Sequence, residues 1–259
     1  MKDTLVLGGG GLLGICILGA LDCLFGEYEQ SNFKNICGTS VGALIGLLLC
    51  FKTPFEIYEI MLTQNLFQEE NLDFVDFFTE FGFIKHDLIR NELSKHIPEN
   101  ITFEELYTIS QKHLCIVGTN LTLQCCELFD YKKTPDMKIV DAVCISLSVP
   151  FVFQKYNYND CIYIDGCVTL NFPWNVFDVE ESCKLGVKVK STSKTNDEMD
   201  LLHFAQSVIS TLVNESYEER GALHIDIDFP YMKEYTPGDV IQLYKSGNES
   251  AYNWLKKLK

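Results

Sequence analysis

The sequence predicts an α/β protein with a mostly parallel central sheet, and three observations lead to this prediction. Residues 4–8 and 35–38 are short apolar runs, each typical of a buried strand. A glycine-containing turn follows each run. An apolar stretch of helical length then follows each turn, at residues 14–25 and 43–51. A strand, a tight turn and a buried helix, repeated in this order, are typical of parallel strands covered by helices.

Later segments extend this pattern. Further strands are predicted at residues 113–119, 124–129, 163–166, 185–189 and 224–227, and further helices at 139–148, 199–219 and 239–258. Residues 55–105 have helical character and many aromatic side chains, which predicts a helical cap beside the sheet. Because no linker or repeat interrupts the chain, we expect one domain over residues 1–259.

The composition indicates an acidic protein with a sizeable core. Hydrophobic residues make up 47% of the chain, and 36 Asp and Glu against 21 Lys and Arg give a formal charge of -15. Nucleic acid is not expected as a partner, because phosphate backbones are bound by clustered Lys and Arg. The charge also disfavours electrostatic docking on anionic membranes, although transient contact of an apolar patch with a membrane surface remains open.

The cysteines and the N-terminal segment bear on the compartment. Eleven cysteines without a C-x-x-C pair argue against zinc and favour a reducing compartment in which most thiols pack in the core. Residues 4–21 carry no charge, as in a signal peptide or membrane span. The glycines at residues 8–11 would weaken such a helix, so we expect a soluble, cytoplasmic chain. No metal or other cofactor is expected, because no cluster of ligands has metal spacing.

The segment Gly38-Thr39-Ser40-Val41-Gly42 is a G-x-S-x-G motif between an apolar strand and an apolar helix. A serine hydroxyl becomes an effective nucleophile when it is held on a sharp strand-to-helix turn and paired with a base. Gly38 and Gly42 leave room for such a nucleophile elbow. The motif therefore predicts Ser40 as the nucleophile of an acyl hydrolase. The alternative is a helix N-cap formed by Thr39 or Ser40.

A glycine-rich loop lies between the first strand and its helix. It contains Gly9, Gly10 and Gly11, and Gly14 follows two residues later. Glycines let the backbone approach a reacting centre and direct N–H groups at a developing oxyanion, and the helix that follows adds its positive end. We therefore predict that Gly9, Gly10 and Gly11 contribute to an oxyanion hole.

The same glycines also match the G-x-G-x-x-G pattern of dinucleotide-binding proteins. That alternative needs an Asp or Glu at the end of the next strand to bind the ribose. The strand ends in Cys37-Gly38-Thr39-Ser40 instead, so the candidate nucleophile stands where the acid is needed. A dinucleotide is therefore disfavoured.

The base is predicted to be an aspartate rather than a histidine. None of the five histidines follows a late sheet strand, where a hydrolase histidine is expected; they are His86, His96, His113, His203 and His224. Asp165 does end a predicted strand, and Gly166 follows it. An Asp-Gly pair after a strand is usually only a turn. The residues alone therefore leave the role of Asp165 open.

Together these motifs resemble those of the patatin-like phospholipases. The glycine loop ending at Gly14, the Ser40 elbow and the Asp-Gly pair at 165–166 occur in the order of that family. Residues 148–153 (Ser-Val-Pro-Phe-Val-Phe) and 171–173 (Asn-Phe-Pro) are similar to further family segments. The likeness covers nearly the whole chain.

The resemblance implies a three-layer α/β/α fold and a Ser-Asp dyad in which Asp165 takes the Ser40 proton directly. It implies oxyanion donors in the loop at residues 9–11 and at the N–H of Val41, with Gly14 and Gly166 as supporting positions. It also implies hydrolysis of acyl esters in phospholipids or related lipids, through an acyl-enzyme on Ser40.

Two positions depart from the family pattern. Leu13 stands where the family usually has Arg or Lys, and Cys167 replaces the glycine or alanine usual after Asp165-Gly166. Cysteine is small, so we expect the dyad to survive. Oxyanion donors need no side chain at position 13, so acyl chemistry should persist. The missing cation predicts that neutral esters are cleaved about as well as phospholipids, and that Leu13→Arg shifts the preference if the site has room.

Two other functions use the same residues differently. Acyl transfer to an alcohol would replace hydrolysis, and a non-catalytic lipid-binding or regulatory module would keep only the fold. Intact Ser40 and Asp165 argue against the module, and Leu13 argues mildly for it.

The phenylalanines of the predicted cap either pack its own core or line an acyl-chain groove; they are Phe67, Phe74, Phe77, Phe78, Phe81 and Phe83.

Overall fold

The structure of the protein is a computed structural model that describes residues 1–63, 80–193, 204, 207–208, 211, 221–229 and 235–258. Its helices and strands follow the order expected from the sequence. The strands are β1 (Thr4–Leu7), β2 (Asn35–Thr39), β3 (His113–Asn120), β4 (Cys125–Asp130), β5 (Tyr156–Tyr158), β6 (Cys161–Asp165), β7 (Lys184–Ser191) and β8 (Ala222–Ile227). The helices are α1 (Gly14–Leu24), α2 (Val41–Leu48), α3 (Pro54–Thr63), α5 (Asp87–Leu93), α6 (Phe103–Ser110), α7 (Ile139–Ser146), α8 (Cys167–Leu170) and α10 (Pro237–Leu258). Short 3-10 turns lie at Gly11–Leu13, Gln30–Asn32 and Glu181–Cys183.

All eight strands of the described residues belong to one open sheet, in the order β5-β6-β3-β2-β1-β7-β8 with β4 paired to β3. The pairs β1–β2, β1–β7, β2–β3 and β7–β8 are parallel, whereas β4, β5 and β6 pair in the antiparallel sense. The central strand β1 is buried along its whole length, as its continuous apolar run predicts. The predicted α/β fold with a mostly parallel sheet is confirmed.

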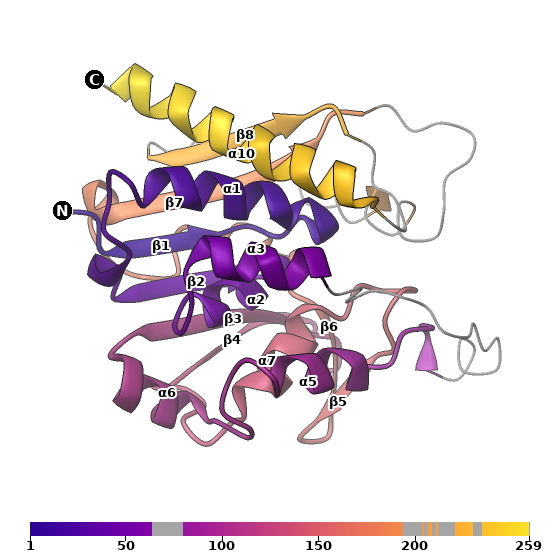
Figure 1. The fold of residues 1–259 in the computed structure, drawn as a ribbon. Helices are drawn as coiled ribbons and strands as arrows, with labels where there is room; N and C mark the ends of the chain where they lie inside the picture. The colour runs from indigo at the N-terminus through magenta and orange to yellow at the C-terminus, as the bar shows by residue number, and fades with distance from the viewer. Residues whose placement is uncertain are drawn as a thin grey trace.

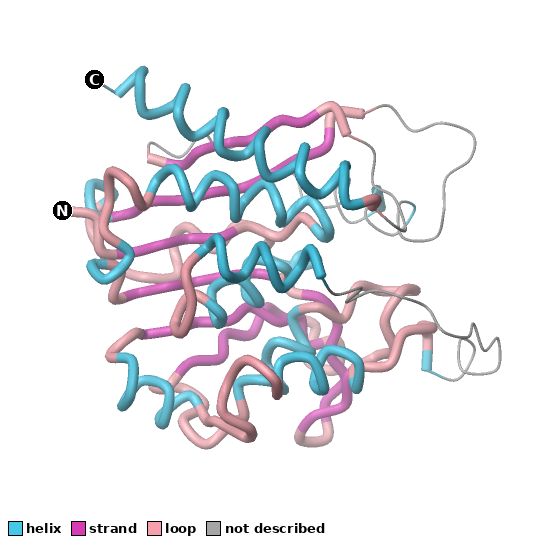
Figure 2. The backbone as a smooth tube through the Cα atoms, in the orientation of Figure 1, coloured by secondary structure: helices cyan, strands magenta, loops and turns pink. Residues whose placement is uncertain are grey.

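Helices cover one face of this sheet, and a thinner layer covers the other. In Figure 1, α10 and α1 lie side by side in front of β8 and β7, and Figure 2 shows the helices grouped on that side. Leu5, Ile36 and Val187 of the sheet join these helices in the main core. On the opposite face, Val6 packs with Phe172 and Trp174, and Cys37, Cys115 and Val117 form a cluster against which Leu170 of α8 packs.

The predicted cap at residues 55–105 is described in part. Its helix α3 packs on α1, and its helix α5 packs on α7 (Figure 1). Phe67, Phe74, Phe77 and Phe78 lie outside the described residues. Phe81 is 59% exposed, and Phe83 is half-buried. The cap and the single domain therefore stay predictions.

Several element boundaries differ from the predictions. Helix α2 begins at Val41, directly after Ser40 and two residues before the predicted start. The short helix α8 replaces the turn expected after Asp165, because Gly166 already has helical dihedral angles of -61° and -24°. The hairpin of β5 and β6 was not predicted as a pair of strands. The helix predicted at 199–219 lies mostly outside the described residues.

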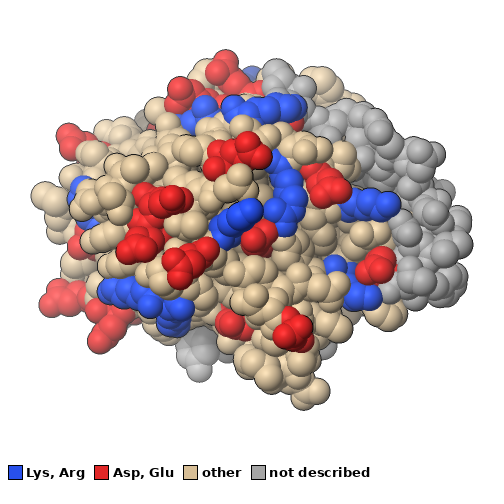
Figure 3. Space-filling view, turned by 90° about the horizontal axis from the view of Figure 1, so that it is seen from below, with Lys and Arg blue, Asp and Glu red and all other residues tan. Residues whose placement is uncertain are grey.

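The surface carries both signs of charge (Figure 3), and five of the eleven cysteines are buried, fewer than the majority expected. Figure 3 shows Lys and Arg side chains intermixed with Asp and Glu on the face seen from below Figure 1. The cysteines are free, and five are buried: Cys16, Cys37, Cys115, Cys144 and Cys167. Among the described residues, no helix combines the length and the apolar character needed to cross a membrane. The same residues contain no group of three or more His, Cys, Asp or Glu suited to a metal ion.

Candidate active site

Ser40 lies on a sharp turn between β2 and α2, with φ of 54° and ψ of -125°. These angles are outside the strand and right-handed helix ranges, which is expected of a nucleophile elbow and rare for a side chain other than glycine. A Cβ on Gly38 would lie 2.3 Å from the Gly42 carbonyl oxygen, and a Cβ on Gly42 would lie 2.5 Å from the Leu7 carbonyl oxygen. The two glycines therefore let β1, β2 and α2 approach closely at the elbow.

Asp165, the last residue of β6, faces Ser40. The Ser40 Oγ donates a hydrogen bond to Asp165 Oδ2 at 2.7 Å, a distance suited to direct proton transfer. Ser40 is 3% exposed and Asp165 is fully buried. The expected contact between the two side chains is confirmed.

The N-cap alternative for this motif is wrong. The Ser40 side chain makes no capping hydrogen bond to α2, because its hydroxyl is directed at Asp165. The Thr39 hydroxyl donates to the Leu170 carbonyl oxygen at 2.9 Å instead of accepting from the helix.

The carboxylate of Asp165 accepts hydrogen bonds on both oxygens. Besides the bond from Ser40, Oδ1 accepts the Cys167 backbone N–H at 2.7 Å. Burial raises the pKa of Asp165 to about 6, and hydrogen bonds from Ser40 and from the Cys167 N–H and thiol oppose that rise. The carboxylate is thus a stronger base than an exposed aspartate and is still ionised at neutral pH.

Other residues hold the main chain on either side of the dyad. The Ser40 N–H donates to Ser146 Oγ at 2.8 Å. The Asp165 N–H donates to the Ser148 carbonyl oxygen at 2.8 Å, and the Thr119 hydroxyl donates to the Asp165 carbonyl oxygen at 2.9 Å. No sequence motif points to Ser146 or Thr119, because a contact such as that of Ser146 with Ser40, across 106 residues, leaves no local pattern.

Gly9 lies against the dyad, but its N–H is already engaged. A Cβ on Gly9 would lie 2.3 Å from Cys167 Sγ and 3.3 Å from Ser40 Cβ. The Gly9 N–H donates to the Asn171 carbonyl oxygen at 3.2 Å. Gly9 therefore gives the backbone its close approach, and its predicted role as an oxyanion donor does not fit this hydrogen bond.

Three of the predicted donors remain. Within the described part of the chain, the N–H groups of Gly10, Gly11 and Val41 have no backbone or side-chain acceptor. Val41 is the first residue of α2, where the helix dipole adds positive potential. Gly11 has φ of 55°, the left-handed region that favours glycine. These N–H groups are the candidates for oxyanion binding.

The two supporting glycines allow close packing next to the site. A Cβ on Gly14 would lie 2.4 Å from Val41 Cγ2, at the contact of α1 with α2. A Cβ on Gly166 would lie 2.4 Å from the Val117 carbonyl oxygen. Both are places where a side chain would displace the backbone that carries the dyad.

The described histidines have other partners. His86 Nε2 bonds Ser148 Oγ at 2.8 Å, His96 Nε2 lies 3.0 Å from Glu92, and His113 Nε2 lies 3.4 Å from Asp130. His224 lies on the exposed side of β8, and His203 is outside the described residues. Burial lowers the pKa of His86 to about 4, so this ring is neutral at physiological pH. Asp165 is therefore the side-chain partner of Ser40 in the described part of the protein.

Leu13 does not line this site. Its side chain is fully buried and belongs to the main hydrophobic core. An arginine at this position would be placed among apolar side chains and not beside a substrate phosphate. The shift expected from Leu13→Arg required room for the longer side chain, and this buried position does not provide that room.

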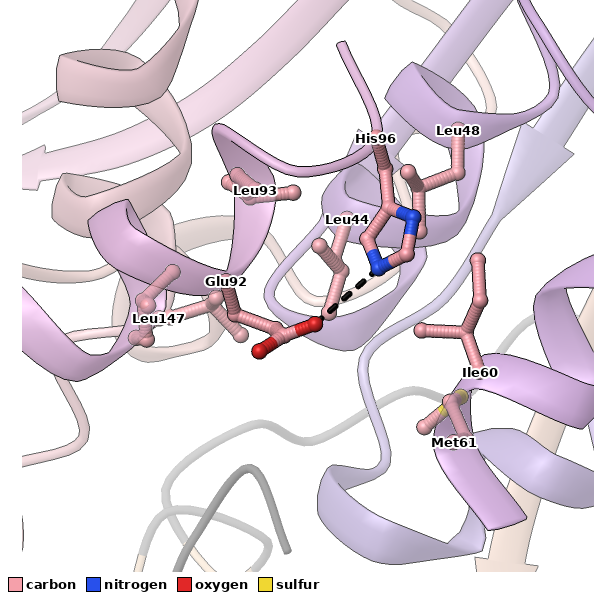
Figure 4. Close-up of a pocket in the computed structure, with 9 residues that line it drawn as sticks. Leu44, Leu48, Ile60, Met61, Glu92, Leu93, His96 and Leu147 are labelled. Atoms are coloured by element: carbon pink, nitrogen blue, oxygen red, sulfur yellow. Dashed lines mark hydrogen bonds and ion pairs between the residues drawn. The ribbon is translucent and has the colours of Figure 1, made fainter. Parts of the chain in front are cut away.

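An apolar pocket lies along the outer side of α2. Figure 4 shows Leu44 and Leu48 of α2 facing Ile60 and Met61 of α3, with Leu93 and Leu147 on the other side. A hydrogen bond of 3.0 Å joins His96 and Glu92, the two polar side chains among the described lining residues. Among the described residues the lining is mostly aliphatic, and Phe81 and Phe83 do not belong to it.

Comparison with known proteins gives a consistent result. The profile of the patatin-like phospholipases matches residues 5–178. Probable lipid hydrolase 463L of Invertebrate iridescent virus 6 is 34% identical over 182 residues, which cover 67% of this chain and 62% of the viral protein. Uncharacterized protein R571 of Acanthamoeba polyphaga mimivirus is 31% identical over 204 residues, covering 75% of this chain and 67% of that protein. Triacylglycerol lipase 5 of Saccharomyces cerevisiae is 30% identical over 177 residues, covering 60% of this chain and 22% of the lipase.

Solved structures share the fold at low sequence identity. VipD from Legionella pneumophila matches with a TM-score of 0.61 and 15% identity, covering 99% of this chain and 67% of VipD. The type III effector ExoU matches with a TM-score of 0.57 and 18% identity, covering 99% of this chain and 53% of ExoU. The profile match spans the glycine loop, the Ser40 elbow and Asp165, and the chain therefore belongs to the patatin-like phospholipase family.

Proposed function

We propose that this protein hydrolyses carboxylic esters of lipids, with Ser40 as nucleophile and Asp165 as general base. The observation that carries the proposal is the 2.7 Å hydrogen bond from Ser40 Oγ to Asp165 Oδ2, formed at a nucleophile elbow. Membership of the family, and relatives named as a lipid hydrolase and a triacylglycerol lipase, support a lipid substrate.

In the acylation step, Ser40 Oγ attacks the ester carbonyl carbon while its proton passes to Asp165 Oδ2. The carbonyl oxygen becomes an oxyanion, which the N–H groups of Gly10, Gly11 and Val41 bind. The tetrahedral intermediate then collapses, the bond from carbon to the alcohol oxygen breaks, and the alcohol leaves with the proton from Asp165. The acyl group stays on Ser40 as an ester.

In the deacylation step, a water molecule attacks the carbonyl carbon of this acyl-enzyme and gives its proton to Asp165. The same N–H groups bind the second oxyanion. Collapse of the intermediate breaks the bond from carbon to Ser40 Oγ, which takes the proton back from Asp165. Fatty acid is released, and the dyad returns to its starting state.

The apolar pocket along α2 suits the acyl chain of such a substrate. Leu44 lies four residues after Ser40, about 6 Å along the helix from the rise of 1.5 Å per residue. Leu48, one turn further, lines the same pocket and extends it away from the nucleophile. Ile60 and Ile89 come from the segment predicted as a cap, so this segment would supply one wall of the acyl site.

The test is turnover of a water-soluble neutral ester, followed by product analysis. Wild type should release free acid in the presence of chelator, and Ser40→Ala and Asp165→Asn should each lose at least about a thousandfold in kcat. Product found as an ester of added glycerol would favour acyl transfer. A folded wild-type protein without turnover of any ester would favour the non-catalytic module.

A further inference from the structure

The C-terminal end of α7 contacts the main chain of both dyad residues. Ser146, the last residue of α7, accepts the Ser40 N–H on its Oγ at 2.8 Å. Two residues later, the Ser148 carbonyl oxygen accepts the Asp165 N–H at 2.8 Å. Both serines are buried, with exposures of 0% and 1%. Residues 146–148 therefore bridge a nucleophile and a base that lie 125 residues apart in the chain.

Ser40 depends on an external acceptor because of its backbone conformation. Its φ of 54° places it outside both β2 and α2, so its N–H belongs to no helical hydrogen bond. Such a conformation persists only when the surroundings fix it. A buried N–H without an acceptor is unfavourable, and Ser146 Oγ is the acceptor that this structure provides.

Ser148 is itself held by two partners. Its hydroxyl donates to the Cys144 carbonyl oxygen at 2.6 Å and lies 2.8 Å from His86 Nε2. Because the single hydroxyl hydrogen is used for Cys144, His86 must donate its Nε2–H to Ser148. The His86 ring packs edge-on against Tyr156, with ring centroids 4.9 Å apart. The Ser148 carbonyl oxygen that binds Asp165 is thus fixed in place.

We propose that Ser146 and Ser148 are positioning residues of the dyad, which set the separation of Ser40 and Asp165 through their main chains. The inference rests on the proposed function and adds residues that contact neither the substrate nor the reacting atoms. Removal of the Ser146 hydroxyl should loosen the elbow and lengthen the contact from Ser40 Oγ to Asp165.

The test compares Ser146→Thr with Ser146→Val, because these side chains have the same shape and differ in the hydroxyl. Any steric cost of the added methyl group is common to both variants. We expect kcat on a soluble ester to be 10- to 100-fold lower for the valine variant than for the threonine variant, with similar KM. The acid limb of the pH profile should also move upward in the valine variant, because the Ser40 hydrogen bond lowers the Asp165 pKa.

Ser110 offers a matched control at the end of another helix. It is the last residue of α6, and its hydroxyl accepts the Lys112 N–H at 3.1 Å. The pair Ser110→Thr and Ser110→Val should show equal kcat and the same pH profile. Ser148→Ala, which frees the segment from Cys144 and His86, should lower kcat with little change in KM.

Two results would overturn the inference. Equal kcat and equal acid limbs in the folded Ser146→Thr and Ser146→Val proteins would show that the hydroxyl has no positioning role. If both Ser146 variants fail to fold, the test rests on the Ser148→Ala protein. An unchanged kcat of Ser148→Ala would then contradict the inference. An inactive wild-type protein would instead refute the proposed function itself, so the two failures are distinguishable.

Discussion

Thr39 and Asp165 pair with consecutive residues of β3, Val117 and Gly118. Strand β4 pairs along β3 through both of these positions, so it occupies one side of β3. The end of β2 and the end of β6 must therefore share the other side, where they run toward each other. Ser40, the residue after Thr39, is placed opposite Asp165 by this arrangement.

Because the ends of β2 and β6 meet head-on, the residue that follows β6, Gly166, must lack a side chain. A Cβ on Gly166 would lie 2.4 Å from the Val117 carbonyl oxygen and 3.1 Å from Thr39 Cγ2. A side chain here would push β6 away from β2. The reach of a serine and an aspartate side chain is short, so the dyad requires the two strand ends in close contact.

The first prediction concerns the pH dependence of catalysis. The base must be ionised, and burial raises the pKa of Asp165 to about 6. We expect kcat/KM on a neutral ester to be constant above this pH and to fall about tenfold per pH unit below it. A profile without any acid limb between pH 5 and 7 would contradict the assignment of Asp165 as base.

A pair of variants assigns this limb to Asp165. The Cys167 thiol and backbone N–H both lower the pKa of Asp165 by hydrogen bonding. Cys167→Ala removes the thiol donor and should move the acid limb upward, whereas Cys167→Ser keeps a donor and should leave the limb close to that of wild type. A limb that stays in place in both variants would point to another titrating group.

A second prediction concerns stability. The unfolded pKa of an aspartate is about 3.9, and the folded pKa of Asp165 is about 6. Between these values the folded state binds more protons than the unfolded state, so stability falls as the pH rises through this window. Asp165→Asn removes the buried charge and should raise the free energy of unfolding at pH 8 by roughly 1–3 kcal/mol.

Urea unfolding of wild type and Asp165→Asn at pH 8 and pH 4 tests this sign. The advantage of the asparagine variant should shrink strongly at pH 4, where the wild-type carboxyl is protonated. A variant that is less stable than wild type at pH 8, and more so than at pH 4, would show that the ionised carboxylate stabilises the fold.

A third prediction follows from the position of Leu13. Its side chain is fully buried, so Leu13→Arg should destabilise the protein by about 3 kcal/mol or more through an unpaired buried charge. The neighbour Leu12 is half-buried, and Leu12→Arg should cost less than about 1 kcal/mol. Thermal and urea unfolding of both proteins measure the contrast. Equal stability of the two variants would mean that position 13 opens to solvent.

A fourth prediction tests the acyl pocket. Ile60 is half-buried and lines the pocket from α3, so Ile60→Trp should fill part of the space without disturbing the core. Loss of room for two or three methylenes should lower kcat/KM for an octanoyl ester by roughly 10- to 50-fold at about 0.8 kcal/mol per buried methylene. The acetyl ester should react as before.

Ile109→Trp is the control for this experiment, because Ile109 is 60% exposed on α6 and lies outside the pocket. It should leave the ratio of octanoyl to acetyl rates unchanged. Equal loss on both esters in Ile60→Trp would place the acyl chain elsewhere.

The parts of the site that depend on local sequence were predictable. A strand, a glycine-flanked serine and a helix determine the elbow, because all three lie within a short segment around Ser40. The hairpin of β5 and β6 also had a local signal that was missed. Asn159 and Asp160 both have positive φ, the pattern of a two-residue hairpin turn that Asn and Asp tolerate.

The remaining parts depend on contacts between distant segments. The register of β6 against β3 decides which residue faces Ser40, and no periodicity in the sequence encodes it. The engagement of the Gly9 N–H by Asn171 and of the Ser40 N–H by Ser146 arises in the same way. The burial of Leu13 likewise follows from the packing of α1 on the core, which a family pattern at this position does not reveal.

Covalent trapping with a fluorophosphonate probe tests the central claim most directly. An activated serine displaces fluoride from this probe and forms a stable phosphonate ester. Peptide mass analysis should find one adduct, on Ser40, with labelling abolished in Ser40→Ala and slowed at least a hundredfold in Asp165→Asn. An adduct on another serine, or labelling of Asp165→Asn at the wild-type rate, would contradict the Ser40–Asp165 dyad.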